Sequence, residues 1–428
     1  MANVTDFTPA WAYVPAAYDR ANVMPQIPVG VVNLSNTRGS TNFRLRYDGA
    51  YRETSTNDLI NHYPLKNGKL HPNPVLFLEQ KTTNDVPRST DFSAWTANNL
   101  SVQNNQLNNP EKLQNADVLV SNNVAGTHSV SIVSATTLGS GPAVVSCFVH
   151  CGDREHVRLE IVRGATTYFQ FFNIKTNVLG DKQGVDSAGI IDYPDGWKRV
   201  FMIITTTGTV STTFKLLVAD GNTIGDESFT GNNNADIWAW GYQYERNARV
   251  KPSSFIATNA TAGDRARDLC QFAGPVSLFN SQEGIFYIDV TWSKMSENPA
   301  SIGLCDGTQN NGIFFARQTA AADTINSFVK VGGANVSFKA INTFNVGNRL
   351  RLAIAWQKDQ FIHVVNGQQV HFDATGATFT IQQLNRVVFS NGNNANVFDG
   401  FVHEIRVYNP THLSTGNLQA FLRTITRK

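Results

Sequence analysis

Asp-Gly and Asn-Gly pairs recur along the chain, and they constrain its fold more than any other feature of the sequence. Such a pair tolerates the positive φ angles of a tight hairpin turn, so each marks a point where two antiparallel strands join. The runs between them are rich in β-branched and aromatic residues, and helical periodicity is nearly absent. We therefore predict an all-β fold, with turns at Asp48-Gly49, Asn67-Gly68, Asp195-Gly196, Asp220-Gly221, Asp306-Gly307, Asn366-Gly367, Asn391-Gly392 and Asp399-Gly400.

The polar residues of the chain are mostly uncharged. Only 16% of the 428 residues are charged, well below the roughly 25% usual in soluble proteins, and Asn, Thr, Ser and Gly take their place. Such neutral surfaces are typical of β-rich extracellular or virion proteins. The net charge of +2 creates no long-range field toward nucleic acid or an anionic membrane. We therefore expect no nucleic-acid partner and no membrane partner.

The N-terminus and the cysteines indicate folding in a reducing cytoplasm. The first residues lack the basic and apolar regions of a secretory signal, and no apolar run is long enough to span a bilayer. The few scattered cysteines do not form a disulfide framework. Cys147 and Cys151 could bind a metal with His150 and His156, but strand alternation points His150 away from both, so we favour buried thiols. We predict no cofactor and assign no metal.

Prolines set the N-terminal region apart from the rest. Residues 1–75 carry prolines at positions 15, 25 and 28, which exclude a long helix and disfavour a central strand. We predict either a flexible leader or, as the aromatic residues favour, an extended N-terminal arm that orders against a partner. Its aromatic residues Trp11, Tyr13 and Tyr18 are the candidates for docking on a partner.

Two further regions follow the arm. Residues 76–273 and 274–428 each contain short strands at regular spacing with polar turns, which predicts two tandem jelly-roll β-sandwich domains. In the last region Asn366-Gly367 turns the chain between two strands, and residues Leu418 to Leu422 form a short helix near the end. No repeat of a solenoid or β-helix is visible.

A set of ordered motifs runs through roughly residues 45–270. It consists of a leading segment that ends in Phe and Trp, a Trp-Gly-x-Gln-x-Glu strand, a Ser-x-Ile-x-Thr segment and an Arg-x-x-Asp end. With these motifs the region resembles a carbohydrate-binding-module-like β-sandwich found in bacteriophage virion proteins, although "DVPR" follows Asn84 where the family has hydrophobic residues. The matching residues are Glu79, Thr83, Asn84, Phe92, Trp95, Trp240, Gly241, Gln243, Glu245, Ser254, Ile256, Thr258, Arg265 and Asp268.

The last region carries a more general pattern. A strand ends at Trp356, a hairpin closes at Asn366-Gly367, and the strand "DGFVHEIRVY" ends at Tyr408. This pattern is similar to concanavalin A-like or laminin-G-like jelly rolls. The resemblance implies a domain that binds glycans or proteins, or that builds assemblies.

Motifs for catalysis are absent from the sequence. Glycan hydrolysis needs two carboxylates about 5 to 9.5 Å apart on one face. Asp226 and Glu227 are neighbours and would point to opposite faces of a strand, whereas Asp153 and Glu155 alternate correctly but lie in a polar turn. No serine-nucleophile elbow, zinc-protease motif or phosphate-binding loop occurs. We predict that the protein is not an enzyme.

An alternating aromatic strand is the first candidate for ligand binding. In "DIWAWGYQYE" the residues Trp238, Trp240, Tyr242 and Tyr244 fall on one face of an undistorted strand. That face either belongs to the sandwich core, which we favour, or forms a platform on which sugar rings stack. The four aromatics are therefore kept as candidate carbohydrate-binding residues.

Asn-rich stretches in the last region are the second candidate. "CDGTQNNG" and "SNGNNANVFDG" could hydrogen-bond a sugar or coordinate calcium through oxygen atoms, and the alternative is that they are neutral polar turns. Their candidate carbohydrate-binding residues are Asn310, Asn311, Asn393 and Asn394.

Together these features predict a non-enzymatic structural protein of a bacteriophage virion, made in the host cytoplasm and carried as a tail fibre, head fibre or capsid decoration. Its arm would dock on other virion proteins of the capsid or tail, and its sandwiches would contact neighbouring copies or bind host-surface glycans. The family resemblance implies a homo-oligomer, commonly a trimer. Two alternatives stay open: a tailspike-type glycan depolymerase and a secreted lectin-like adhesin, which the missing secretion signal disfavours.

Overall fold

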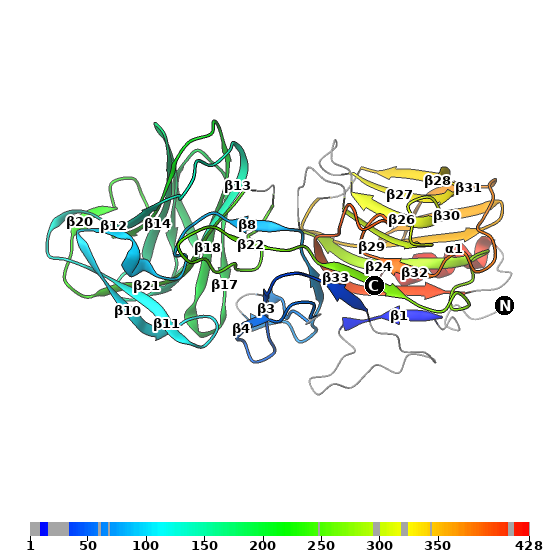
Figure 1. The fold of residues 1–428 in the computed structure, drawn as a ribbon, viewed down its shortest axis with the longest axis horizontal. Helices are drawn as coiled ribbons and strands as arrows, with labels where there is room; N and C mark the ends of the chain where they lie inside the picture. The colour runs from blue at the N-terminus through cyan, green and yellow to red at the C-terminus, as the bar shows by residue number, and fades with distance from the viewer. Residues whose placement is uncertain are drawn as a thin grey trace.

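The computed structural model describes residues 9–15, 34–58, 61–66, 69–246, 249–293, 300–317, 324–342, 345–409 and 415–427. They form two β-sandwiches that lie side by side (Figure 1). Nearly all of the regular structure is antiparallel β-sheet, which confirms the predicted all-β class and its sandwich architecture. None of the described helices has the length and apolar character that a bilayer crossing requires.

The middle sandwich packs a six-stranded sheet against a seven-stranded sheet. The first sheet has the order β10 (Leu100–Asn108), β11 (Gln114–Ser121), β21 (Ala235–Glu245), β13 (Gly141–Cys151), β18 (Lys198–Thr206) and β17 (Val185–Asp192). The second has the order β16 (Val178–Gln183), β15 (Thr166–Asn173), β14 (His156–Arg163), β19 (Thr212–Ala219), β12 (Ala125–Val133) and β20 (Ser228–Thr230), with β9 (Thr96–Asn98) beside β12. Their inner faces enclose an apolar core that includes Val145, Leu159 and Leu216.

The C-terminal sandwich is built from two seven-stranded sheets. One has the order β1 (Trp11–Tyr13), β33 (Gly400–Tyr408), β24 (Gly284–Trp292), β29 (Arg349–Gln357), β30 (Gln360–Val365) and β31 (Gln368–Asp373), with β7 (Leu76–Leu78) also on β33. The other has the order β2 (Ser35–Thr37), β23 (Leu269–Ala273), β32 (Arg386–Val388), β25 (Ala300–Cys305), β26 (Gly312–Arg317), β27 (Ile325–Val331) and β28 (Ala334–Ile341).

A helix and two hairpin turns agree with the sequence. The predicted helix is present and longer than expected, as α1 (Thr415–Thr426), whose apolar side packs on the outer face of the sheet that contains β24 and β29. Asn366-Gly367, with φ angles of 45° and 81°, joins β30 to β31, and Asp195-Gly196, at 58° and 81°, joins β17 to β18. Paired positive φ angles are the geometry for which such residues are favoured in two-residue hairpins.

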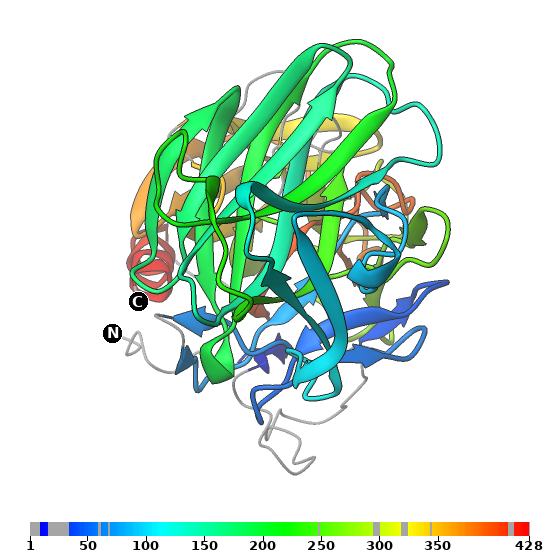
Figure 2. The ribbon, with the colours of Figure 1, turned by 90° about the vertical axis from the view of Figure 1, so that its left-hand side faces the viewer.

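The N-terminal region differs from the predicted arm. Strand β1 pairs with β33, with Trp11 opposite Val407, and β2 pairs with β23. Short extended segments can pair with sheet edges without the length that proline forbids, so β1 and β2 each add a strand to one sheet of the C-terminal sandwich. Strand β7, which follows residue 75, also pairs with β33. In Figures 1 and 2 the N-terminal segment (blue) runs along one side of both sandwiches.

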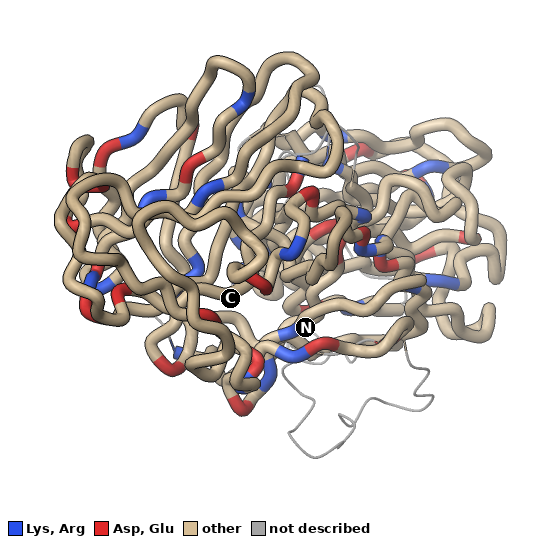
Figure 3. The backbone as a smooth tube through the Cα atoms, turned by 60° about the vertical axis from the view of Figure 1, so that its left-hand side comes forward, with Lys and Arg blue, Asp and Glu red and all other residues tan. Residues whose placement is uncertain are grey.

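Smaller elements connect the sandwiches. A hairpin of β3 (Asn42–Leu45) and β4 (Tyr51–Thr54) packs on the outer face of the β21 sheet, and β8 (Thr82–Asn84) pairs with β22 (Gly263–Arg265). The remaining elements are β5 (Leu65–Lys66), β6 (Lys69–Leu70) and the 3-10 turns η2 (Phe92–Ala94) and η3 (Pro194–Gly196). Charged residues of both signs are intermingled over both sandwiches (Figure 3), in keeping with the small net charge.

Candidate functional site

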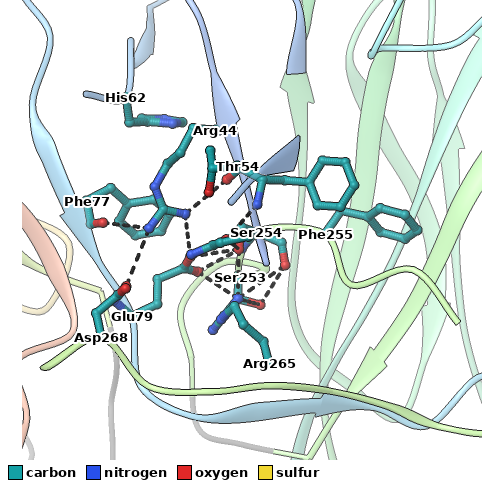
Figure 4. A network of polar contacts seen from close by, with 12 residues as sticks. Arg44, Thr54, His62, Phe77, Glu79, Ser253, Ser254, Phe255, Arg265 and Asp268 are labelled. Carbon is teal, nitrogen blue, oxygen red and sulfur yellow. Dashed lines mark hydrogen bonds and ion pairs between the residues drawn. The ribbon is translucent and has the colours of Figure 1, made fainter. Parts of the chain in front are cut away.

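A buried ionic cluster lies where the two sandwiches meet. At its centre is Glu79, which follows β7 and is fully buried. Its Oε1 lies 3.0 Å from Nη1 of Arg265 on β22, and its Oε2 lies 2.9 Å from Nη1 of Arg44 on β3 (Figure 4). The Ser254 hydroxyl donates to Oε2 at 2.7 Å. Glu79 therefore joins three segments that are distant in the sequence.

Two more carboxylates extend this cluster. Asp268 accepts from Arg38 at 2.7 Å, and its second oxygen lies 3.5 Å from Arg44. Asp399, directly before β33, pairs with Arg249 at 2.6 Å. All five side chains are buried, and a buried ion that loses its partner is strongly destabilising. The cluster therefore fixes the N-terminal hairpin and the two sandwiches to one another.

The charge of Glu79 is set by its neighbours. Burial alone would raise the pKa of this carboxyl, but the guanidinium groups of Arg265, Arg44 and Arg249 outweigh it and hold the pKa well below its usual range. Glu79 is consequently ionised at any physiological pH.

Residues that carry the family resemblance are concentrated at this junction. The Asn84 amide donates to the carbonyl groups of Tyr242 and Ile256, and Gln243 Oε1 accepts from the Ile256 N–H at 2.8 Å. The Thr258 hydroxyl donates to the Val86 carbonyl. Together with Glu79, Ser254, Arg265 and Asp268, these side chains connect backbone segments to each other. Their role in the structure is to hold the junction together.

A cavity of about 320 Å³ opens beside the ionic cluster. Residues of the middle sandwich, the C-terminal sandwich and the N-terminal hairpin all contribute to its wall. Asp and Glu side chains are absent from the described lining, whereas three cationic side chains are present. The lining consists of Leu45, Tyr51, His62, Pro64, Leu65, Phe77, Ile191, Tyr193, Arg199, Arg249, Val250, Lys251, Pro252, Ser253, Ser254, Thr291, Ser293, Gly347, Phe401 and His403.

Aromatic rings form part of the cavity wall. Phe77 on β7 and Phe401 on β33 are stacked, with centroids 4.6 Å apart and an interplanar angle of 25°. The ring of His62 lies 5.7 Å from Phe401, and its Nδ1 accepts from the Leu45 N–H at 3.3 Å. Burial lowers the pKa of His62 to about 3, and the Arg44 guanidinium adds to this shift. His62 is therefore a neutral polar group at pH 7.

His403 and two tyrosines complete the neutral polar part of the lining. Burial lowers the pKa of His403 to about 4, with a further contribution from Arg349, and its Nε2 lies 3.1 Å from the Thr291 hydroxyl. Burial raises the pKa of Tyr51 and Tyr193. All of these groups are uncharged near neutral pH, so they can hydrogen-bond a ligand without adding charge.

Arg199 is a buried cation of the cavity wall. Its side chain is 2% exposed; Nη1 donates to the Ser253 carbonyl at 2.7 Å and Nη2 to the Ser146 hydroxyl at 3.1 Å. Its guanidinium carbon lies 4.8 Å from the centre of the Phe148 ring. Among the described residues no carboxylate forms an ion pair with Arg199, and its Nε has no hydrogen-bond partner.

The alternating aromatic strand is divided between two faces. The prediction that its four aromatics share one face is wrong, because β21 has a bulge at Gly241, whose φ is 66°. Tyr242 and Tyr244 lie in the core of the middle sandwich. Trp240 is buried on the other face, with its ring 4.6 Å from Phe255, and Trp238 on that face is half-buried. Three of the four aromatics thus offer no exposed ring to a sugar.

The predicted asparagine residues do lie close together. The loops that carry them are neighbours, since a side chain at Gly392 would collide with the Thr308 carbonyl and Asn391 donates to Gln309 at 3.3 Å. Asn310, Asn393 and Asn394 are exposed, whereas Asn311 donates to Asp306 and accepts from Gly332. No group of metal-binding side chains is found among the described residues.

The predicted docking residues belong to the protein's own fold where they are described. Trp11 is buried in the core of the C-terminal sandwich, where its ring stacks on Phe272 at 4.7 Å. Tyr13 packs against the same core. Tyr18 lies outside the described residues. The buried ring of Trp11 has no surface left for a virion partner.

The carboxylates and thiols considered for chemistry have local partners. Asp153 accepts from the amides of Asn232 and Asn234, which hold its pKa below its usual range, and Glu155 pairs with Lys175. Cys147 is a buried free thiol whose pKa is raised by burial, while Cys151 is half-buried.

No family model and no curated protein matches the chain. Among solved structures, the CBM40 module of the Ruminococcus gnavus IT-sialidase bound to α2,3-sialyllactose covers 34% of this chain and 84% of its own, with 15% identity and a TM-score of 0.29. Mouse laminin α1 chain domains LG4-5 cover 67% and 86%, with 10% identity and a TM-score of 0.24. None of the comparisons indicates a bacteriophage origin.

A third solved structure bears on the question of catalysis. Trypanosoma rangeli sialidase matches over 88% of this chain and 64% of its own, with 9% identity and a TM-score of 0.28. This match overturns the prediction, made from the sequence, that the protein is not an enzyme. At this identity and TM-score it assigns neither an activity nor a catalytic residue to the chain.

Proposed function

We propose that the protein binds carbohydrate in the cavity between its two sandwiches. The observation that carries the proposal is the cavity, whose volume of about 320 Å³ is at the lower end of the ~300–1,000 Å³ usual for small-molecule sites. Its wall combines aromatic rings, which pack against the apolar faces of sugars, with hydroxyl, imidazole and cationic groups, which hydrogen-bond sugar hydroxyls. The volume suits one sugar ring.

The ionic cluster supports this proposal because it preorganises the wall. Phe77 and Ser254 contact the cluster directly: the Phe77 carbonyl accepts from Arg44, and the Ser254 hydroxyl donates to Glu79. A wall that is fixed before the ligand arrives loses little entropy on binding. Binding would then require no movement of one sandwich relative to the other.

Isothermal titration calorimetry against neutral and acidic monosaccharides, after a screen on a glycan array, tests the proposal. We expect binding to the full chain and its loss in Val250→Trp, which places a large ring in the cavity wall. The control is Val276→Trp, a substitution at an exposed residue outside the lining, which leaves affinity unchanged. Binding that survives Val250→Trp in a folded protein would place the ligand elsewhere, and no binding to any sugar would refute the function.

We further propose that the protein is a component of a bacteriophage particle. Its support is the motif resemblance of the middle region, together with the low charge of the chain. Because Trp11 is buried in the protein's own core, contacts with other virion proteins would use a different surface. Mass spectrometry of purified particles, followed by immunogold labelling, would find the chain on the particle. Its absence from intact particles would refute this location.

A further inference from the structure

The charges at the junction do not balance. Its buried arginines are Arg38, Arg44, Arg199, Arg249 and Arg265, and its buried carboxylates are Glu79, Asp268, Asp399 and Glu245. Five guanidinium groups against four carboxylates leave one positive charge without a counter-charge. His62, Tyr51 and Tyr193, which also face this region, are neutral near pH 7.

Arg199 is the residue on which the excess charge lies. Arg38, Arg44, Arg249 and Arg265 each form an ion pair with a carboxylate. Two carboxylates are linked to Arg199 through the backbone at Ser253, whose carbonyl accepts from Arg199. The Ser253 N–H donates to Glu245 at 3.0 Å, and the Ser254 N–H donates to Glu79 at 2.8 Å. Neither carboxylate forms an ion pair with Arg199.

Arg163 shows how this fold otherwise satisfies a buried guanidinium without an ion pair. It donates to the carbonyl groups of Leu138, Gly139 and Gly208 and to the Thr212 hydroxyl, at 2.8 to 3.1 Å, and it lies away from the cavity. Arg199 has one carbonyl and one hydroxyl acceptor at these distances, the Tyr193 hydroxyl also interacts with its guanidinium, and Arg199 lines the cavity. A guanidinium carries five N–H donors, so Arg199 keeps donors for a ligand.

We propose that Arg199 binds the carboxylate of an acidic sugar in the cavity. A carboxylate offers two acceptor oxygens to the planar fork of an arginine, and a buried pair of this kind is strong because the alternative is an uncompensated charge. The absence of Asp and Glu from the described lining removes the repulsion that an anion would meet. This inference rests on the proposed carbohydrate binding and narrows it to sugars that carry a carboxylate.

Matched sugars test the role of the carboxylate on the unaltered full chain. D-glucuronate and D-glucose differ only at C6, as do D-galacturonate and D-galactose, and the methyl ester of glucuronate keeps the shape of the acid without its charge. We expect calorimetry to detect at least one of the acids, with its neutral partner and its ester bound at least tenfold more weakly. Equal affinity for acid and neutral sugar would overturn the role of Arg199 while leaving carbohydrate binding intact. No binding to any of them would overturn both proposals.

Variants test the residue itself. We expect Arg199→Gln to lose the preference for the acid, and Arg163→Gln, the matched buried control, to keep it. Arg199→Lys retains the charge but not the fork, so it should keep the preference with weakened affinity. If Arg199→Gln does not fold, the proposal is tested by the affinity of the Arg199→Lys variant and by the ratio of the affinities of the unaltered protein for glucuronate and its methyl ester. An unchanged preference in a folded Arg199→Gln protein would overturn the proposal.

Discussion

Arg265 and Arg199 occupy the same junction, are both almost fully buried, and differ in what surrounds their charge. Arg265 donates to Glu79 and to the Ser254 hydroxyl, so its charge is matched inside the protein. Arg199 has only neutral acceptors among the described residues. Burying a charge costs free energy, and a charged partner nearby offsets that cost. Arg265 therefore helps to hold the sandwiches together, whereas Arg199 keeps a charge that is available to a ligand.

The largest expected effect on stability follows the loss of Glu79, the ion-pair partner of Arg265. Glu79→Gln removes the shared partner of Arg265 and Arg44, which leaves Arg265 without a carboxylate and Arg44 with only its longer contact to Asp268. We expect the free energy of unfolding to fall by about 3–5 kcal/mol, measured by urea denaturation at pH 7. The control Asp264→Asn breaks the exposed pair with Lys81 and should cost less than ~1 kcal/mol. A loss below ~1 kcal/mol in Glu79→Gln would show that the cluster does not stabilise the junction.

A smaller loss is expected when a neutral hydroxyl of the cluster is removed and all of its charges stay. The Ser254 hydroxyl donates to Glu79 at 2.7 Å and accepts from Arg265 at 2.8 Å. Hydrogen bonds to charged groups contribute about 1.5–3 kcal/mol, so Ser254→Ala should lower the unfolding free energy by that amount. Ser293→Ala, in the same cavity wall but outside the cluster, should change it by less than ~0.5 kcal/mol. Equal effects of the two variants would contradict the special role of the cluster.

Acid should destabilise the protein through His62, because its protonation would add a further positive charge to the cavity wall. Its pKa in the folded protein is about 3, below its ordinary 6.5, so between these values the unfolded chain binds a proton that the folded chain does not. The contribution of His62 to the unfolding free energy is therefore retained above pH 6.5. It is lost as the pH drops toward 3, by at most ~1.4 kcal/mol per pH unit for one group. Between pH 7 and 5 we expect His62→Gln to lose about 2 kcal/mol less than the unaltered protein. An identical pH dependence of the two proteins would mean that folding does not lower the pKa of His62.

The fold was predictable where the signals are local. Asn366-Gly367 and Asp195-Gly196 mark hairpins because their positive φ angles are a property of those residues. The pairing of Trp11 with Val407 depends on segments almost a whole chain apart, and three-residue strands carry no periodicity to announce them. Gly241 did carry a signal, since glycine within a strand indicates a bulge, but the uninterrupted aromatic alternation around it favoured a regular strand.

The site was less predictable than the fold. Glu79, Ser254 and Arg265 were recognised as part of a family pattern, yet their role in a buried ionic cluster required the structure. Arg199 gave a local signal, because a charged residue within the apolar strand "KRVFMII" is a candidate for burial. The sequence could not show that Arg199 faces a cavity, because the wall is assembled from residues between Leu45 and His403 that meet only in the folded chain.

The smallest expected effect on stability is also the sharpest test of the comparison. Arg199→Met removes hydrogen bonds from a charged group to Ser253 and Ser146, each worth about 1.5–3 kcal/mol. It also removes a buried charge that no described carboxylate matches and whose desolvation costs several kcal/mol. These contributions oppose one another, so the unfolding free energy without ligand should change by less than ~1 kcal/mol. Arg265→Met deletes a paired charge of similar burial and should cost about 3–5 kcal/mol, because the buried Oε1 of Glu79 loses its close ion-pair partner. Urea denaturation of the two variants side by side measures the difference. A loss in Arg199→Met as large as that in Arg265→Met would mean that the fold itself requires the charge of Arg199, and the distinction between the two arginines would fail.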